Sequence, residues 1–222
     1  MTTEAIRMAS LARRERQKAE TRQAILDAAR VLFVEHGVAA TTMRGIAAAI
    51  GYTPTAIYHH FRDKEALLLE LCLEDFGAMA RALHAIGTIP DPIERLRQMA
   101  HAYVGFAVAN PQQYRLLFMT ELPDFPLEPG SPVPYPGEGA YRFLVDTVAE
   151  AAAQQRLRAP YEDPAVLAQL LWSGVHGLAT LWFTHFKDPL VQLRHPSAVV
   201  DAMCDALMCG ALRPAPQEVG FP

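Results

Sequence analysis

Cysteine is scarce in this chain, which has three in 222 residues. The spacing of Cys72, Cys204 and Cys209 fits no metal-binding motif, and an odd number argues against a framework of disulfide bonds. We interpret all three as small apolar residues of the interior. The sequence therefore predicts neither a metal site nor a bound cofactor.

The motifs of the common enzyme classes are also missing. The sequence contains no Gly-x-Ser-x-Gly, no Cys-x-x-Cys, no phosphate-binding loop and no dinucleotide-binding fingerprint. The adjacent residues His59 and His60 would diverge on a helix, which suits neither a metal pair nor a base beside a nucleophile. No catalytic residue can be assigned, so an enzyme is the least favoured class of function.

Long apolar runs of the kind that cross a membrane are not expected either. Apolar residues make up 51% of the chain, but we interpret the apolar stretches as interrupted by Arg, Glu, Asp or Gln before they reach the ~18 residues that a span requires. Residues 1–20 contain no apolar core of the signal-peptide type. The prediction is a cytoplasmic protein that does not contact a membrane.

Negative charge is under-represented in the first part of the chain. The net charge of −4 hides an asymmetry, because residues 1–64 hold ten Lys and Arg against six Asp and Glu, whereas residues 65–222 hold ten against eighteen. A basic segment that neutralises phosphates gives salt-dependent binding to nucleic acid. A solvated basic face is common. The charge asymmetry therefore indicates nucleic-acid binding only when the same segment also carries a DNA-binding motif.

Such a motif is present in residues 41–64, TTMRGIAAAIGYTPTAIYHHFRDK, which predict two short helices separated by a tight turn. Thr41 or Thr42 can cap the first helix and Thr53 the second. Pro54 fits the first helical position, where no N–H is needed. Gly51 falls where the chain must enter a left-handed conformation.

The second of these helices has little apolar surface to bury. We expect Ala56, Ile57 and Phe61 to point inward. The polar side chains of the same segment are left to face outward, namely Thr53, Thr55, Tyr58, His59 and His60. A helix this short with so many exposed hydrogen-bonding groups suits the major groove of DNA, whose width admits one helix.

This run resembles the helix-turn-helix of the TetR family of bacterial transcriptional regulators. The shared pattern is a Thr-capped helix with Ile-Ala, a Gly, a capped turn with Pro and small residues, Ile-Tyr-x-x-Phe, and Asp-Lys-Glu-Ala-Leu. With AILDAARVLFVEHG in front, the resemblance covers roughly residues 19–70. A shorter match, Trp172-Ser-Gly-Val-His176-Gly177, is similar to the Trp-x-x-x-His-Gly pattern of one C-terminal subgroup of that family.

The resemblance implies a repressor that binds a palindromic operator in double-stranded DNA and is released by a small, largely apolar effector. Base contacts are assigned to Arg44, Thr53, Thr55 and His59, and phosphate contacts to Arg22, Thr42, Tyr58 and Lys64. Pro54 is also placed at the operator. Family members often have Gly, Ala or a basic residue where this chain has Pro54-Thr55, so no base preference is transferred. A helix-turn-helix protein without an effector is the alternative.

The rest of the chain predicts further helices and no strand, at about 19–36, 64–85, 92–108, 111–120, 138–157, 163–186 and 196–211. Arg22 and Lys64 would lie in first turns, where a cation opposes the helix dipole, which favours contact with phosphate. We predict an all-α protein with a three-helix DNA-binding domain at 19–64, a larger helical bundle for ligand binding and dimerisation at 65–213, a flexible basic arm at 1–18 and a tail at 214–222. The Pro-rich stretch 123–137 is predicted to be a surface loop.

The helical bundle is predicted to hold both a dimer face and an effector pocket. Gly174 and Gly177 would let another helix approach closely, and with the last helix they could form a four-helix contact with a second copy. The pocket candidates are aromatic, sulfur or imidazole groups, namely Tyr103, Phe106, Phe118, Met119, Trp172 and His176. A plain apolar core would give the same pattern.

Overall fold

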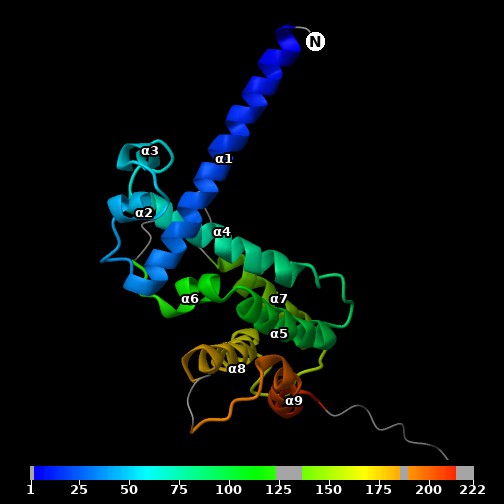
Figure 1. The fold of residues 1–222 in the computed structure, drawn as a ribbon. Helices are drawn as coiled ribbons and strands as arrows, with labels where there is room; N and C mark the ends of the chain where they lie inside the picture. The colour runs from blue at the N-terminus through cyan, green and yellow to red at the C-terminus, as the bar shows by residue number, and fades with distance from the viewer. Residues whose placement is uncertain (1–2, 124–136, 186–189, 214–222) are drawn as a thin grey trace, which may run out of the picture. The chain divides into compact units, whose positions relative to one another are not determined.

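The structure, a computed structural model, describes residues 3–123, 137–185 and 190–213 (Figure 1). These residues form α-helices and one short 3-10 helix at Pro196–Ala198. Within them there is no strand, only an isolated bridge between Leu157 and Leu212. The predicted all-α class is therefore confirmed. The predicted loop at 123–137 lies almost wholly outside the described residues, and so does the predicted tail at 214–222.

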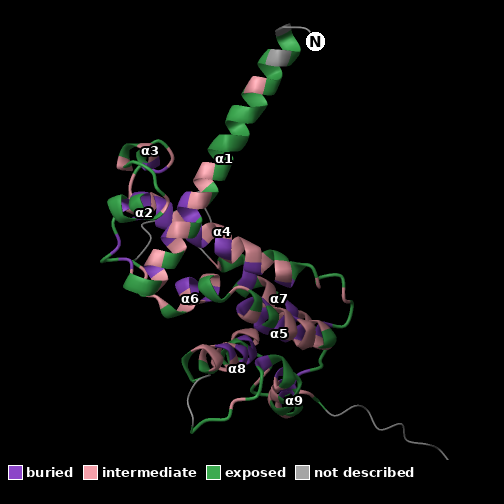
Figure 2. Ribbon diagram, in the orientation of Figure 1, coloured by how far each residue is buried: buried purple, intermediate pink, exposed green. Residues whose placement is uncertain are grey.

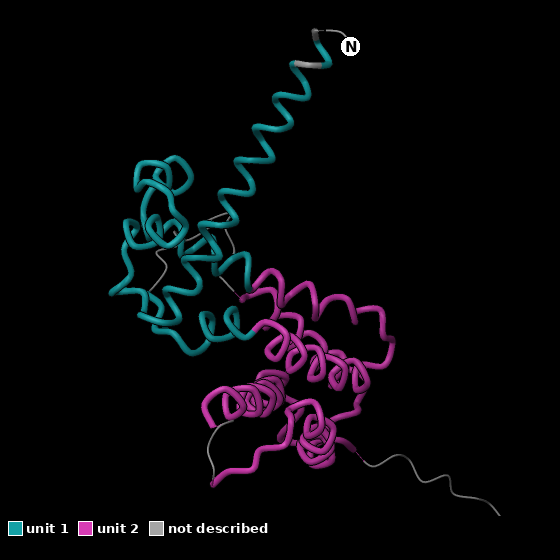
Figure 3. The backbone as a smooth tube through the Cα atoms, viewed as in Figure 1, with its two compact units in different colours: residues 1–75, 111–131 teal, residues 76–110, 132–222 magenta. Residues whose placement is uncertain are grey.

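The chain divides into two compact units (Figure 3). Residues 1–75 with 111–131 make the first unit, and residues 76–110 with 132–222 make the second. The chain thus changes unit inside α4 (Lys64–His84) and again just before α6 (Pro111–Met119). The predicted domain division at residue 64 stays a prediction, since the change of unit falls further along α4.

The first unit is built on α1 (Thr3–His36), which packs against α2 (Met43–Ala49) and α6, while α2 packs against α3 (Pro54–Tyr58). Its core consists of fully buried aliphatic and aromatic side chains, among them Ile25, Phe33, Ile46, Ile57, Leu67, Leu71 and Tyr114. Figure 2 shows that burial is confined to the C-terminal half of α1, whereas its N-terminal half is mainly exposed.

The prediction that the first helix begins near residue 19 was wrong, because α1 begins at Thr3. Residues 3–18, expected to be a flexible arm, are helical. The segment consists mainly of Ala, Arg, Glu, Gln, Leu, Met and Lys, all residues of high helix propensity, and no Gly or Pro interrupts it. Arg22 consequently lies in the middle of a helix, so the dipole argument that pointed it toward phosphate does not hold.

The second unit is a bundle of α5 (Pro92–Ala109), α7 (Glu138–Ala153), α8 (Pro164–His185) and α9 (Val200–Ala211). The first three pack against one another, and α9 packs against α5 and α8. α7 ends four residues earlier than predicted, where Gln155 adopts a φ of 56°. The predicted helix at 196–211 is divided into the 3-10 turn and α9.

The prediction that no segment is apolar enough to cross a membrane was also wrong. By length and composition alone, α8 could do so, because residues 164–186 contain no Asp, Glu, Lys or Arg. In the structure α8 instead packs against three helices through Leu167, Ala168, Leu171, Val175 and Ala179. A helix that is apolar on most sides is also what the interior of a helical protein or a subunit interface requires.

Candidate nucleic-acid interface

The segment from α2 to α3 adopts the two capped helices that its sequence predicts. Thr42, rather than Thr41, caps α2, and its hydroxyl accepts the Gly45 N–H at 3.0 Å. Thr41 is buried and donates to the carbonyl of Gly37 at 2.8 Å. Thr53 caps α3 by accepting the Ala56 N–H at 3.3 Å.

The turn between the two helices depends on Gly51, which has a φ of +69°. An L-residue with a Cβ would be strained in this left-handed region, although nothing would block the Cβ sterically. The turn sends the chain back so that Ile57 and Phe61 are buried while Ala56 is half-buried. Two short helices are thereby fixed at a defined angle by one small apolar cluster.

The other side of α3 is open to solvent. Ile57 is the one buried residue of the helix, while Thr53, Thr55 and His59 are exposed and Tyr58 has 54% of its surface accessible. Pro54 is half-buried. Four hydrogen-bonding side chains therefore project from the seven consecutive residues 53–59, within a span that a groove of DNA can accept.

His60 does not face outward as predicted. It is half-buried at the end of α3, and its Nδ1 is buried without a hydrogen-bond partner among the described residues. Burial, together with the positive charges of Arg22 and Lys18 on α1, lowers the pKa of His60. The residue is therefore held neutral and lies on the side of α3 that faces α1.

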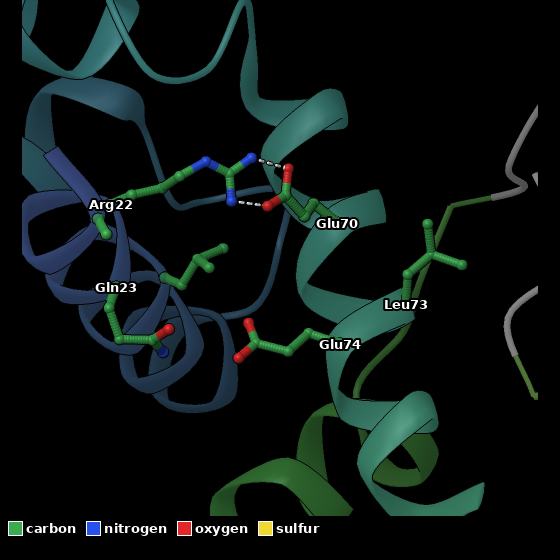
Figure 4. A pocket seen from close by; sticks show the side chains of 7 residues that line it. Arg22, Gln23, Glu70, Leu73 and Glu74 are labelled. Atoms are coloured by element: carbon green, nitrogen blue, oxygen red, sulfur yellow. Dashed lines mark hydrogen bonds and ion pairs between the residues drawn. The ribbon is translucent and has the colours of Figure 1, made fainter. Parts of the chain in front are cut away.

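Arg22 forms an ion pair with Glu70 of α4 and stacks over the ring of Phe61, with its guanidinium carbon 4.6 Å from the ring centre. Figure 4 shows the two side chains meeting across a surface hollow that is lined by Ala19, Arg22, Gln23, Leu26, Glu70, Leu73 and Glu74. The Arg22 guanidinium is thus already engaged by Glu70 and Phe61 of the same unit. Phosphate contact by Arg22 stays a prediction that would require this ion pair to be shared or exchanged.

Lys64 is likewise engaged. Its ammonium donates to the carbonyls of Val38 at 2.8 Å and Thr41 at 3.1 Å, which ties the start of α4 to the loop before α2. Arg44 of α2 is exposed and forms no ion pair among the described residues. Of the three basic residues assigned to the operator, Arg44 is therefore the one whose charge is most available.

A buried ionic cluster holds the first unit together beneath this surface. Asp75 of α4 is fully buried and accepts from Arg30 of α1 through two hydrogen bonds of 2.8 and 2.9 Å. The Gln113 amide of α6 donates to the same carboxylate at 2.8 Å. One side chain thus joins three helices, and it does so close to both points at which the chain changes unit.

Three of the predicted effector contacts come together in the second unit. The Tyr103 hydroxyl lies 3.0 Å from Nδ1 of His176, and the Trp172 ring lies 6.0 Å from the His176 ring. Burial lowers the pKa of His176. Tyr141 of α7, which the sequence did not indicate, adds a fourth group 5.8 Å from the Trp172 ring. Tyr141 joins this group through the packing of α7 on α8, which no local sequence pattern predicts.

The remaining pocket candidates are distributed differently. Phe106 is buried in α5 of the second unit, whereas Phe118 and Met119 lie on α6 of the first unit, with Phe118 against the Tyr114 ring at 5.0 Å. None of the six candidates lines the hollow between α1 and α4. A common site for all six therefore stays a prediction.

Comparison with known proteins places both parts of the chain in one family. Residues 25–71 match the family described as bacterial regulatory proteins, tetR family, and residues 96–207 match the tetracyclin repressor-like C-terminal domain. The matched family consists of regulatory proteins, which agrees with the prediction of a regulator rather than an enzyme.

Curated relatives match mainly the DNA-binding part. The HTH-type transcriptional repressor AcnR of Corynebacterium efficiens is 44% identical over 69 residues, which is 31% of this chain and 37% of AcnR. The repressor Rv1474c of Mycobacterium tuberculosis is 45% identical over 71 residues, 32% of this chain and 38% of the relative. The chain thus spans less than two fifths of the length of either protein.

A solved structure matches over a longer stretch. The fatty acid degradation regulator FadR from Bacillus halodurans superimposes with a TM-score of 0.69 at 20% identity, covering 85% of this chain and 95% of that one. At this identity the similarity concerns the fold. The helix-turn-helix geometry and the two family matches together show that the chain belongs to the TetR family of bacterial regulatory proteins.

Proposed function

We propose that this chain is a DNA-binding transcriptional repressor that acts in the cytoplasm. It binds a palindromic operator as a homodimer through α2 and α3, and a small, largely apolar effector releases it. Regulators of the family bind operators as dimers and respond to small molecules, and the relatives AcnR and Rv1474c are named repressors.

The observation that carries the proposal is the outer side of α3. A five-residue helix buries one aliphatic side chain and exposes Thr55, Tyr58 and His59. Isolated helices of this length are marginal in water, so packing of Ile57 and Phe61 must hold it in place. Such a short helix, held in place by its packing and with its polar side outward, suits direct reading of base edges in the groove.

Removal of one side chain tests this assignment. We expect Tyr58→Ala to abolish the mobility shift of the intergenic DNA next to the gene, because Tyr58 is the largest exposed group on α3 and would contact phosphate or sugar. The variant should elute like the wild type from gel filtration and melt at a similar temperature, since an exposed side chain contributes little to stability. A normal shift would refute the placement of α3 at the DNA.

The dimer is supported by an unburied apolar stripe on α8. Val166, Leu170 and Leu181 are exposed, and intervals of four and eleven residues put them on nearly the same side of a helix. A Cβ added to Gly177, in the middle of this stripe, would meet nothing within 4 Å. By contrast, a Cβ on Gly174 would lie 2.8 Å from Leu207 of α9. Gly174 thus admits α9 of the same chain, while Gly177 leaves room for a second copy.

The effector site is proposed at Tyr103, Trp172 and His176. They combine aromatic surface with one hydrogen-bonded pair, which suits a largely apolar molecule with a single polar group. The sequence Trp172-Ser-Gly-Val-His176-Gly177 supports a place in the Trp-His-Gly subgroup. A ligand found by thermal shift should also weaken operator binding, and a coupling of about 1–3 kcal/mol changes the affinity about 5–150-fold.

The lowered pKa of His176 gives a further expected result. Because the folded chain holds His176 neutral, the unfolded chain binds the proton first as the pH falls below the ordinary histidine pKa of about 6.5. His176 therefore contributes its full stabilisation above that pH and loses it on acidification. Between pH 7.5 and pH 5.5, roughly one unit either side of that value, the melting temperature of the wild type should fall further than that of His176→Gln. Equal falls would contradict a half-buried His176 that the folded chain holds neutral.

A further inference from the structure

We propose that the N-terminal part of α1, residues 3–18, is a second DNA-contacting element that binds backbone phosphates beside the operator bases read by α3. The contacts are assigned to Arg14 and Lys18, with Arg7 further out. This inference rests on the proposed function and extends it, because it names the protein surface that contacts the DNA flanking the operator.

The assignment begins with helical spacing. Arg7, Arg14 and Lys18 are seven and four residues apart, intervals that return to nearly the same side of an α-helix. Seven residues after Lys18 comes Ile25, which is fully buried in the first unit. The row of cations is thus the outward continuation of the side by which α1 packs onto its own domain. Arg13 and Arg16 lie on the other sides of the helix.

Two contacts fix the direction of that side. The Thr21 hydroxyl lies 3.4 Å from the Tyr52 hydroxyl in the turn before α3, and Arg22 stacks over Phe61 just after α3. The positive charge of Lys18 also contributes to the lowered pKa of His60 at the end of α3. The side of α1 that carries Lys18 therefore faces α3 and its connections.

The cations of this row are available to a ligand. Residues 11–20 are all exposed, as is Arg7, and across the part of the chain that the structure describes none of Arg7, Arg14 and Lys18 forms an ion pair. Among the side chains of this segment that the structure describes, none is fully buried, and the large apolar residues Met8 and Leu11 are exposed. The segment therefore contributes nothing to the interior of the unit, and its exposed cations stay available to an external partner of opposite charge.

The length of the segment fits duplex DNA. Sixteen residues of α-helix extend about 24 Å, whereas the five residues of α3 extend about 7.5 Å. Figure 1 shows α1 running on past α3 and away from the other helices of its unit. A duplex that receives α3 in its major groove, about 12 Å wide, places rows of phosphate on both sides of that helix, within reach of a rod that passes beside it.

Two double variants test the proposal. R14Q/K18Q and R13Q/R16Q each remove two positive charges from neighbouring exposed positions of one helix, and they differ only in the side affected. The probe is a duplex selected by the full-length wild type from a random-sequence pool, prepared with long flanks and also trimmed to the operator core. Binding is measured by fluorescence anisotropy over a series of salt concentrations, and circular dichroism checks the helix content.

On the long duplex we expect R14Q/K18Q to make the slope of log K against log salt shallower by about 0.9 for each lost phosphate contact, hence about 2 per protomer. R13Q/R16Q should keep the wild-type slope, and trimming the flanks should remove the difference. Equal slopes for the two variants would overturn the inference, whether both slopes differ from that of the wild type or neither does. Failure of the wild type to select any duplex would instead overturn the proposed function and this inference with it.

Discussion

Replacement of Asp75 by alanine is expected to lower the free energy of unfolding by about 3 kcal/mol, within the range for removing one partner of a buried ion pair. The variant leaves the Arg30 guanidinium, which is only 11% exposed, without its bidentate acceptor. It also removes the acceptor of the Gln113 amide. The bond from Arg30 to Asp27, 2.8 Å long, would survive and keeps the loss at the lower end of the range. Chemical denaturation, monitored by circular dichroism, measures the difference.

Asp27 supplies the matched control. It accepts from the same guanidinium, but its side chain is 58% exposed. Solvent-exposed ion pairs contribute about 0–1 kcal/mol, so Asp27→Ala should cost less than about 1 kcal/mol. If the two variants lost the same free energy of unfolding, the burial of Asp75 would add nothing to the stability that its ion pair provides. Asp75→Asn tests the charge, because the amide keeps the shape and can still accept from Arg30.

The local features of the DNA-binding segment were predictable from the sequence. Thr42, Thr53 and Asp63 cap their helices because a hydroxyl or carboxylate precedes each helix at the required spacing. Gly51 was predictable for the same kind of reason, since its left-handed φ follows from chemistry within a few residues. The ends of α4, α5 and α6 were also predicted to within about two residues, because Pro and capping residues mark them.

What the sequence did not indicate is which polar groups meet across the fold. The Arg22–Glu70 pair joins residues 48 positions apart, and the Tyr103–His176 pair joins residues 73 apart. No local pattern predicts such partners, and an arginine that faces a carboxylate looks the same in sequence as one that faces a phosphate. The early start of α1 was not predicted for a different reason: residues 3–18 carry no apolar periodicity and are helical by propensity alone.

The apolar stripe on α8 supports a dimer interface on two grounds, one from the sequence and one from the structure. The sequence predicted a dimer face in this part of the bundle, and Leu170 and Leu181 are 41% and 47% exposed in a single chain. Exposed apolar residues scattered singly are ordinary. Here they recur on one side of a helix that contains no Asp, Glu, Lys or Arg, which is typical of a surface that associates with its own copy around a twofold axis.

A glutamate in that stripe should separate the dimer. In the proposed interface Leu170→Glu would bury two carboxylates, one from each copy, and desolvation of an unpaired charge costs several kcal/mol. We expect the variant to sediment as a monomer at concentrations where the wild type is dimeric. Because the two half-sites are then bound independently, operator affinity should fall by about 100-fold or more, the advantage that linking two binding modules confers.

Val31 offers a control of the same chemistry on a different surface. It is an apolar residue of α1 with 39% of its surface exposed, so Val31→Glu introduces the same charge at nearly the same accessibility. This variant should remain dimeric and keep its operator affinity, because no partner covers Val31 in the proposed assembly. A dimeric Leu170→Glu with unchanged affinity would exclude the α8 stripe as the interface. The dimer would then have to form through another surface.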